Sequence, residues 1–255
     1  NGYIRDFTCD LVSFKNNNLK FNFLTPHSSD LKPPRNIVSY YEMPRYITPQ
    51  SQSMNSISLQ GGQGADGLVS TTVQLNQIPD KLIICVKKPV SAQTNYDADL
   101  FYTIKKLRID WNNQSSLLAS ASKQELYNMS VENGSNQTWA EFNGKATVSY
   151  QGISGPFSRY VGTTGSMVVL EFAKDIQLVE DWYAPGSLGN FNLRVSVDVE
   201  NQTTAVITPN SALELNIITL NSGFMVCEHG STSVYTGILS KNDVSHASRG
   251  EAWAK

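Results

Sequence analysis

Histidine, cysteine and carboxylate side chains carry most enzyme chemistry, and in this sequence the first two are few and scattered. The three histidines, His27, His229 and His246, form neither an H-x-H nor an H-E-x-x-H motif, so they lack the spacing of a zinc site. Cys227 and Glu228 directly precede His229, but neighbouring strand residues point to opposite faces of a sheet. This spacing by itself builds no Cys-His dyad. The sequence therefore predicts no metal site and no catalytic cysteine.

One pair of carboxylates stands beside aromatic residues. Glu180 and Asp181 precede Trp182 and Tyr183, a combination that could line a sugar-binding or glycosidase cleft. The alternative is an ordinary loop whose two aromatic residues anchor against the core. The glycine-rich run at 61–64 lacks the lysine of a phosphate loop, which favours a flexible connection. We expect no enzymatic activity and no cofactor.

Composition and charge narrow the class of partner. Only 16% of the 255 residues are charged, and the formal net charge is −2. Nucleic-acid binding depends on clustered lysine and arginine, and the best cluster is only Lys105, Lys106 and Arg108. No run of 18 apolar residues predicts a membrane span. We therefore expect neither direct sequence-specific nucleic-acid binding nor membrane insertion.

The cysteines and the first residue bear on processing and redox state. Three cysteines, Cys9, Cys85 and Cys227, are odd in number and far apart, which favours reduced, mostly buried thiols over a disulfide framework. The chain starts with Asn1, not with methionine. We therefore expect a processed product or an excised portion of a longer protein.

Alternation of apolar and polar residues with a period of two recurs along the chain. It is clearest from Phe191 to Glu200, where five apolar side chains fall on one face. Residues 19–23 and 213–217 alternate likewise, while 82–86 and 167–170 are continuous apolar runs typical of central strands. We expect nine to eleven strands in an all-β sandwich of two packed antiparallel sheets with long loops.

One segment has helical chemistry. Ser122 and Glu125 have the spacing of a capping box, apolar residues follow at roughly helical spacing, and Gly134 offers a stop. The sequence predicts a single short helix at about 122–132, inserted between strands.

Several segments, in order, carry a resemblance to a known family. They are Tyr40–Ile47, Ile78–Ile84, Leu107–Asn113, Ser120–Gly134, Trp139 and Gly144, Gly165–Phe172, Lys174–Leu178, Ala184–Asn201 and Thr236–Val244. Together they resemble the major capsid proteins of the double jelly-roll lineage of DNA viruses, above all those of virophages and Polinton-like viruses. The resemblance covers roughly residues 37–244 and corresponds to the C-terminal jelly roll of such a protein.

The resemblance implies a structural protein of the virion. Such proteins form trimers that tile an icosahedral capsid together with other capsid proteins such as pentons, use no cofactor and catalyse nothing. We expect residues 1–244 to form the jelly-roll domain and residues 245–255 a flexible tail. Assembly would take place inside the host cell.

Within the capsid reading, a single jelly-roll penton or vertex protein remains open. Two other classes also remain open, and the first is a carbohydrate-binding β-sandwich that uses Trp182 or Tyr183 as a platform. The second, a glycosidase-like enzyme using Glu180 or Asp181, is the least favoured reading.

Oligomer contacts are expected on the long segments between strands, where large side chains have no obvious core partner. Three regions supply candidates: segment 24–53, the inserted helix with the residues just after it, and the loop at 179–189. The candidate interface residues are Tyr40, Tyr41, Tyr46, Ile47, Leu126, Tyr127, Trp139, Trp182, Tyr183 and Leu188.

Overall fold

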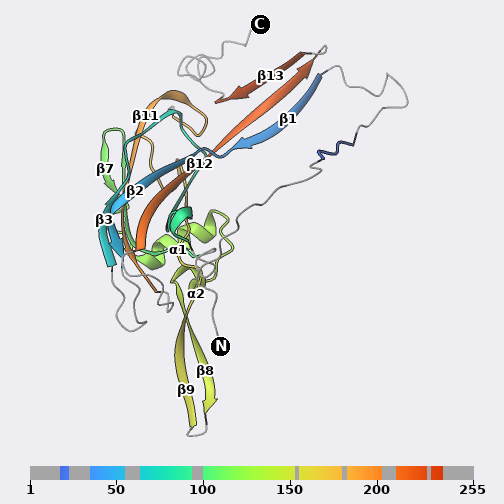
Figure 1. The fold of residues 1–255 in the computed structure, drawn as a ribbon. Coiled ribbons are helices and arrows are strands. Elements are labelled where there is room, and N and C mark those ends of the chain that lie inside the picture. Colours follow the sequence, from blue (N-terminus) through green and yellow to red (C-terminus); the bar gives the residue numbers. More distant parts are fainter. Residues whose placement is uncertain are drawn as a thin grey trace.

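The computed structural model describes eight stretches of the chain: residues 18–22, 35–54, 64–93, 100–152, 155–179, 183–202, 211–228 and 231–237. Within them the chain forms a two-sheet β-sandwich, a small helical layer and two sheet extensions that project from the sandwich (Figure 1).

Two antiparallel sheets form the body. The first has the order β1-β12-β5-β10, with β2 and β13 also paired to β12, and its strands are β1 (Arg35–Glu42), β2 (Arg45–Met54), β5 (Lys81–Lys87), β10 (Val168–Glu171), β12 (Ser211–Glu228) and β13 (Ser231–Thr236). The second has the order β3-β11-β6-β7, with β4 also on β11, and its strands are β3 (Gly64–Val69), β4 (Val73–Gln77), β6 (Thr103–Trp111), β7 (Gln114–Leu117) and β11 (Leu188–Glu200).

The remaining elements are shorter. A separate two-stranded sheet consists of β8 (Lys145–Gly152) and β9 (Gly155–Gly162). The helices are α1 (Lys123–Glu132), α2 (Trp139–Phe142) and a 3-10 turn at Val90–Ala92.

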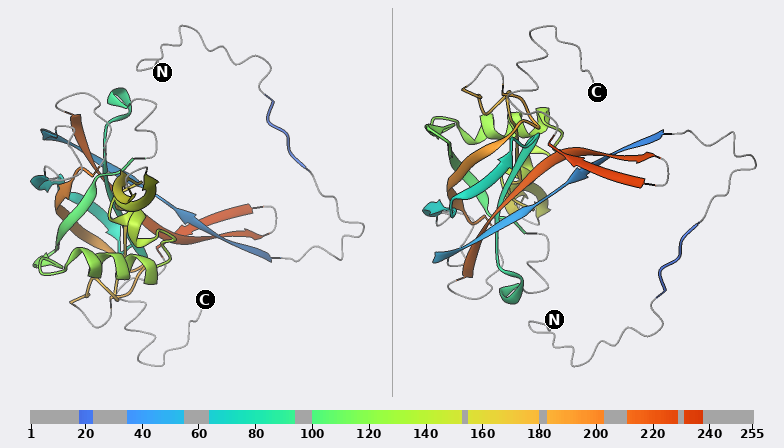
Figure 2. Two further views of the ribbon diagram at one scale, coloured as in Figure 1. Left: turned by 90° about the horizontal axis from the view of Figure 1, so that it is seen from below. Right: turned by 90° about the horizontal axis from the view of Figure 1, so that it is seen from above.

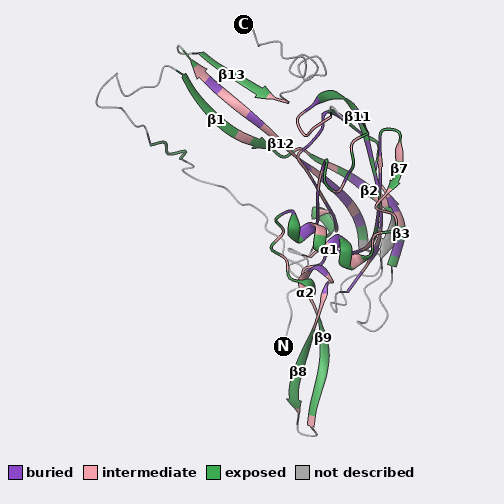
Figure 3. Ribbon diagram, turned by 180° about the vertical axis from the view of Figure 1, so that it is seen from behind, coloured by how far each residue is buried: buried purple, intermediate pink, exposed green. Residues whose placement is uncertain are grey.

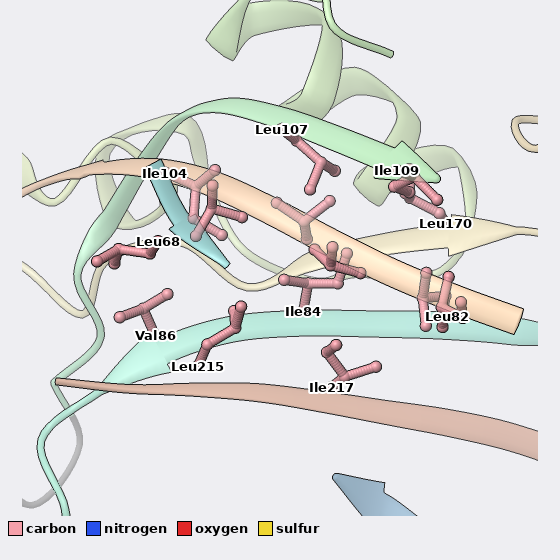
Figure 4. Close-up of a cluster of buried hydrophobic side chains, with 14 of the residues drawn as sticks. Leu68, Leu82, Ile84, Val86, Ile104, Leu107, Ile109, Leu170, Leu215 and Ile217 are labelled. Carbon is pink, nitrogen blue, oxygen red and sulfur yellow. The ribbon is translucent and has the colours of Figure 1, made fainter. Parts of the chain in front are cut away.

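The core lies between the two main sheets, as the alternation in the sequence predicts. Every second residue of β11 from Phe191 to Val199 is buried, and β5 contributes the buried Leu82, Ile84 and Val86 from the facing sheet (Figure 4). Trp111 at the end of β6 is 1% exposed and stacks on Phe191 with ring centroids 5.3 Å apart. Burial of such side chains is the main favourable term in folding.

Helix α1 begins where its capping chemistry predicts. The Ser122 side chain accepts a hydrogen bond from the Glu125 backbone N–H, and the Glu125 carboxylate accepts one from the Ser122 N–H. These bonds satisfy two of the donors that a helix leaves unpaired at its start. They also lower the pKa of the Glu125 carboxyl. Gly134 follows the helix with φ +98°, a conformation that suits glycine.

Three expectations require correction. The described residues contain thirteen strands, more than the nine to eleven expected, and part of the excess is the β8–β9 hairpin. Residues 18–22 form no strand, and Leu19 and Phe21 are largely exposed. The segment expected to be a long loop at 24–53 contains β1 and β2, because both find a pairing partner in β12, some 170 residues further along the chain.

Two findings concern membranes and metals. No helix within the described residues is long and apolar enough to cross a membrane. The same residues contain no group of three or more histidine, cysteine or acidic side chains placed to hold a metal ion.

Candidate assembly surfaces

One free edge of the first sheet is covered by helix α1. The edge strand β10 directs the N–H and the C=O of Val169 away from β5. The Ser130 hydroxyl accepts a hydrogen bond from the Val169 N–H at 3.1 Å, and the Asn133 side-chain amide donates to the Val169 carbonyl at 3.0 Å. Both polar side chains are buried. Covering an edge strand in this way prevents another chain from pairing with it.

Asn133 is also the centre of a wider polar network. Its amide group donates to the Asp175 carboxylate, its side-chain oxygen accepts from Lys174, and its backbone carbonyl accepts from Lys81 at 2.8 Å. Asp175 accepts a further bond from the Glu171 N–H, which makes it a turn residue rather than an acid catalyst. The network fixes the end of α1 against β10.

A hollow of about 600 Å³ lies beside this network, and three of its polar side chains, Lys81, Gln137 and Glu141, are already engaged. Lys81 donates to Asn133, Gln137 bonds the backbone of Gly165 and Met167, and Glu141 belongs to the capping box of α2. Because these groups hold the local structure, the hollow has the character of a structural recess and not of a catalytic cleft.

The first projecting sheet, here called the arm, consists of β1, β13 and residues 221–228 of β12. Strand β12 is 18 residues long: its first half pairs with β2 and β5 in the sandwich, and its second half pairs with β1 and β13 beyond it. Figures 1 and 2 show the arm extending away from the sandwich. A three-stranded sheet with apolar residues and both faces open to solvent is a surface that an interaction would stabilise.

The register assigns the arm's side chains to two faces, because directly opposed residues of an antiparallel sheet point the same way. The aromatic face carries Ile37, Tyr41, Phe224, Val226 and Tyr235, with the Phe224 and Tyr235 rings stacked at 5.0 Å. The acidic face carries Val38, Glu42, Met225 and Val234. Tyr41 is 68% exposed and Val234 61% exposed, so each face presents apolar surface to solvent.

Tyr40 ties the three strands of the arm together. Its hydroxyl hydrogen-bonds the Thr236 hydroxyl on the far strand, and its ring crosses the central strand at Gly223. A Cβ atom at Gly223 would lie 2.7 Å from the Tyr40 ring, so only glycine allows this crossing. Tyr40 therefore acts within its own chain, while its neighbour Tyr41 remains on the surface. In β2, Tyr46 packs partly against the core and Ile47 is 40% exposed.

Two of the three candidate residues near the helices, Tyr127 and Trp139, belong to one aromatic cluster. Tyr127 contacts the rings of Trp139 and of the buried Phe142 at 5.4 and 5.5 Å, and Trp139 stacks on Phe142 at 6.4 Å. Leu126 is completely buried in the core, because α1 packs its side against β10. A side chain that solvent cannot reach offers nothing to a partner, so Leu126 is removed from the candidate interface. Trp139 keeps an exposed edge.

The last three candidates lie before and at the start of β11. Tyr183 packs against the core and meets the Phe191 ring edge-on at 5.3 Å, whereas Leu188 is 42% exposed. Trp182 lies outside the described residues, as do Glu180 and Asp181. The structure therefore does not bring the nine described candidates together: Tyr40 and Tyr41 share the arm, Tyr127 and Trp139 share the aromatic cluster, and Tyr46, Ile47, Leu126, Tyr183 and Leu188 belong to neither group.

The second projecting sheet, the β8–β9 hairpin, was not anticipated. It stands away from the sandwich, and both strands are exposed along nearly their whole length (Figure 3). The sequence contains its signal in the first strand, where Ala146, Val148 and Tyr150 alternate with Thr147 and Ser149. The capping box of α2, formed by Thr138 and Glu141, was equally visible in the sequence and equally missed.

The two described cysteines are free. Cys85 is buried in β5, and burial raises the pKa of its thiol to about 11. Cys227 lies on the arm, half-buried, near the Thr232 hydroxyl. These two residues agree with the expectation of reduced thiols, and Cys9 lies outside the described residues.

A β-sandwich with one sheet edge covered by a helix and two exposed sheets that project outward has surfaces suited to assembly. Comparison with known proteins agrees. Residues 43–223 match the family model described as the major capsid protein V20 C-terminal domain. The chain belongs to this family of viral capsid proteins.

Individual relatives give the same result. The putative capsid protein V20 of Sputnik virophage is 35% identical over 243 residues, which cover 92% of this chain and 39% of that protein. A chain in the cryo-EM structure of the Sputnik virophage matches with a TM-score of 0.73 and 34% identity, covering 88% of this chain and 43% of that one. This chain thus spans about two-fifths of the length of the curated relative.

A more distant match supports the fold alone. The mavirus major capsid protein matches with a TM-score of 0.63 at 14% identity, over 92% of this chain and 47% of that one. Together with the Sputnik match, it confirms the predicted jelly-roll class. The family match and the Sputnik relative also confirm that the chain is a structural capsid protein and not an enzyme.

Proposed function

We propose that this chain is the C-terminal jelly-roll portion of a virophage-type major capsid protein, and that it acts in the virion by assembling with copies of itself. Membership of the major capsid family is the observation that carries the proposal. The coverage of 39–47% of the relatives' lengths supports a second jelly roll in the whole protein. The boundary expected at residue 244 and the tail expected at 245–255 lie outside the described residues, so the division into these two parts stays a prediction.

The oligomer we propose is a trimer that tiles an icosahedral shell with penton proteins. The aromatic face of the arm is the surface we assign to a neighbouring subunit, because Tyr41 and Ile37 are each more than half exposed on it. Ile47, Trp139 and Leu188 are secondary candidates, since each keeps at least 37% of its surface exposed. Tyr40, Tyr46, Tyr127 and Tyr183 would support these contacts from within the chain.

The charges on the second sheet fit a protein–protein role better than a nucleic-acid role. Lys105 pairs with Asp66 at 3.1 Å and Arg108 with Asp198 at 3.6 Å, so two members of the basic cluster have acidic partners. Affinity for phosphates depends on cations that are free to displace counterions. We propose no direct binding of the genome by this surface.

The mass of the purified chain in solution tests the proposal. Light scattering behind a sizing column should give three times the 28.2 kDa of one chain, or a larger assembly. A Tyr41→Ser variant should shift the mass toward the monomer, and Val90→Ser, which removes an equally exposed apolar side chain elsewhere, should leave it unchanged. A strict monomer that binds glycans on an array would favour the carbohydrate-binding alternative, and a pentamer would favour the vertex protein.

A further inference from the structure

The β8–β9 hairpin has one apolar face. Tyr150 is paired with Phe157, Val148 with Arg159, and Ala146 with Val161 in the antiparallel register, so all six side chains point to the same side. The Tyr150 and Phe157 rings stack at 5.5 Å, and Phe157 is 54% exposed. Arg159 is the one charged residue on this face.

The opposite face is polar. It carries Thr147, Ser149 and Ser158, with the two serine hydroxyls 3.3 Å apart, and Lys145 lies over the Tyr160 ring. Such a division between two faces is the pattern of a strand pair that is covered on one side. A two-stranded hairpin alone is at best marginally stable in water. We therefore expect another protein surface to pack against the apolar face of this hairpin.

Nothing in the described part of the chain covers this face. The hairpin touches the body near its base through α2, and beyond that point it stands free of both sheets (Figures 1 and 3). The arm is the other described sheet that projects with exposed apolar residues, and it leaves the sandwich in a different direction. The hairpin and the arm of one chain cannot contact each other in this conformation, whereas the hairpin of one copy can contact the arm of another.

The charges of the hairpin and of the arm also favour contact between these two sheets. The apolar face of the hairpin carries one charged residue, Arg159, while Lys145, the other charged residue of 145–162, lies on the opposite face. The arm contains Arg35, Glu42 and Glu228, a net charge of −1. Arg35 lies 3.9 Å from Glu228, which leaves Glu42 as the anion without an ion-pair partner among the described residues. Glu42 stands on the acidic face of the arm, with Val38, Met225 and Val234 on the same side.

We propose that the apolar face of the β8–β9 hairpin of one copy packs on the acidic face of the arm of a second copy, with Arg159 directed toward Glu42. The inference deepens the proposed function and rests on it. Because the two surfaces differ, the contact is head-to-tail and closes into a ring when the rotation between copies allows. The covered edge at β10 is compatible with this arrangement, since it removes one competing site of strand pairing.

A charge-swap experiment on the whole chain tests the proposal. The mass of wild type, Arg159→Glu, Glu42→Lys and the double variant would be measured by sedimentation velocity over a range of concentrations. Both residues are exposed, so the fold should persist, which far-UV circular dichroism would check. We expect each single variant to raise the concentration for half-assembly at least tenfold. The double variant should recover assembly, and an equimolar mixture of the two single variants should assemble better than either alone.

Two further variants separate a specific contact from a general effect. Lys145→Glu places the same charge change on the polar face of the hairpin and should leave assembly unchanged. Tyr150→Ser removes a 44% exposed ring from the apolar face and should weaken assembly without any change in charge.

The outcomes distinguish the inference from the proposed function. Assembly of Arg159→Glu and Tyr150→Ser at the wild-type concentration would overturn the hairpin contact and leave the capsid role intact. Loss of assembly in the hairpin variants with no effect of Glu42→Lys would show that the hairpin meets another surface, and would overturn the pairing with the arm. A wild-type chain that stays monomeric at every concentration would overturn both the pairing of the hairpin with the arm and the proposal that this portion of the chain assembles with copies of itself.

Discussion

Replacement of Ser130 by alanine tests whether α1 closes the edge of β10. The substitution removes one oxygen from a fully buried site and leaves the Val169 N–H, now bonded to the Ser130 hydroxyl at 3.1 Å, without an acceptor. An unsatisfied buried donor lowers the free energy of unfolding by about 1–3 kcal/mol, and the better helix propensity of alanine offsets about 0.5 kcal/mol of this loss. We expect a net loss of about 1–2 kcal/mol in the free energy of unfolding.

Urea unfolding followed by tryptophan fluorescence measures this loss, because Trp111 is buried between Phe172 and Phe191 in the core. The midpoint should fall while the dependence on urea stays the same. In a domain of this size the melting temperature should fall by roughly 2–4 °C per kcal/mol. Hydrogen exchange at the Val169 amide should also become faster, which reports on the edge directly.

The matched control is Asn128→Ala, which removes a polar side chain from an exposed position of the same helix. Its effect should stay within about 0.5 kcal/mol, as is usual for surface substitutions. If Ser130→Ala unfolds at the wild-type urea concentration and its Val169 amide stays protected, the hydroxyl does not cap the strand edge and the reasoning fails.

Two further predictions concern backbone and thiol chemistry. Gly165→Ala and Gly186→Ala both place alanine at φ +89°, but the new Cβ at 165 would lie 2.0 Å from a backbone oxygen, whereas the one at 186 meets nothing within 4 Å. Thermal melts should therefore show a loss of about 1–2 kcal/mol at 186 and a clearly larger one at 165; equal losses would contradict the close contact. In a Cys9→Ser background, a thiol reagent at pH 8 should label Cys227 far faster than Cys85, whose pKa is raised from 9.0 to about 11 by burial. The pKa of the Cys85 thiol is higher in the folded than in the unfolded chain, so its contribution to the free energy of folding is fully present below pH 9 and declines between pH 9 and about 11. Equal labelling rates of Cys85 and Cys227 would show that the Cys85 site opens readily.

Local chemistry explains what the sequence by itself determined about this protein. The capping box of Ser122 and Glu125 placed the start of α1, because its hydrogen bonds join residues three apart. The alternation from Phe191 to Glu200 identified a strand with one buried face, since side-chain direction in a strand depends only on position. The ordered resemblance along residues 37–244 led to the capsid family, which the family match confirms.

Only the tertiary structure decided which of the large apolar side chains are exposed on the surface. Leu126 was expected to meet a partner but is buried, because α1 packs on β10, which begins about 40 residues later in the chain. Tyr40 and Tyr41 are neighbours in sequence, yet one crosses Gly223 to bond Thr236 while the other stays exposed. Whether a large apolar side chain serves the core or a partner depends on pairings between distant segments. The long strand β12 makes several of these pairings, and no local pattern records them.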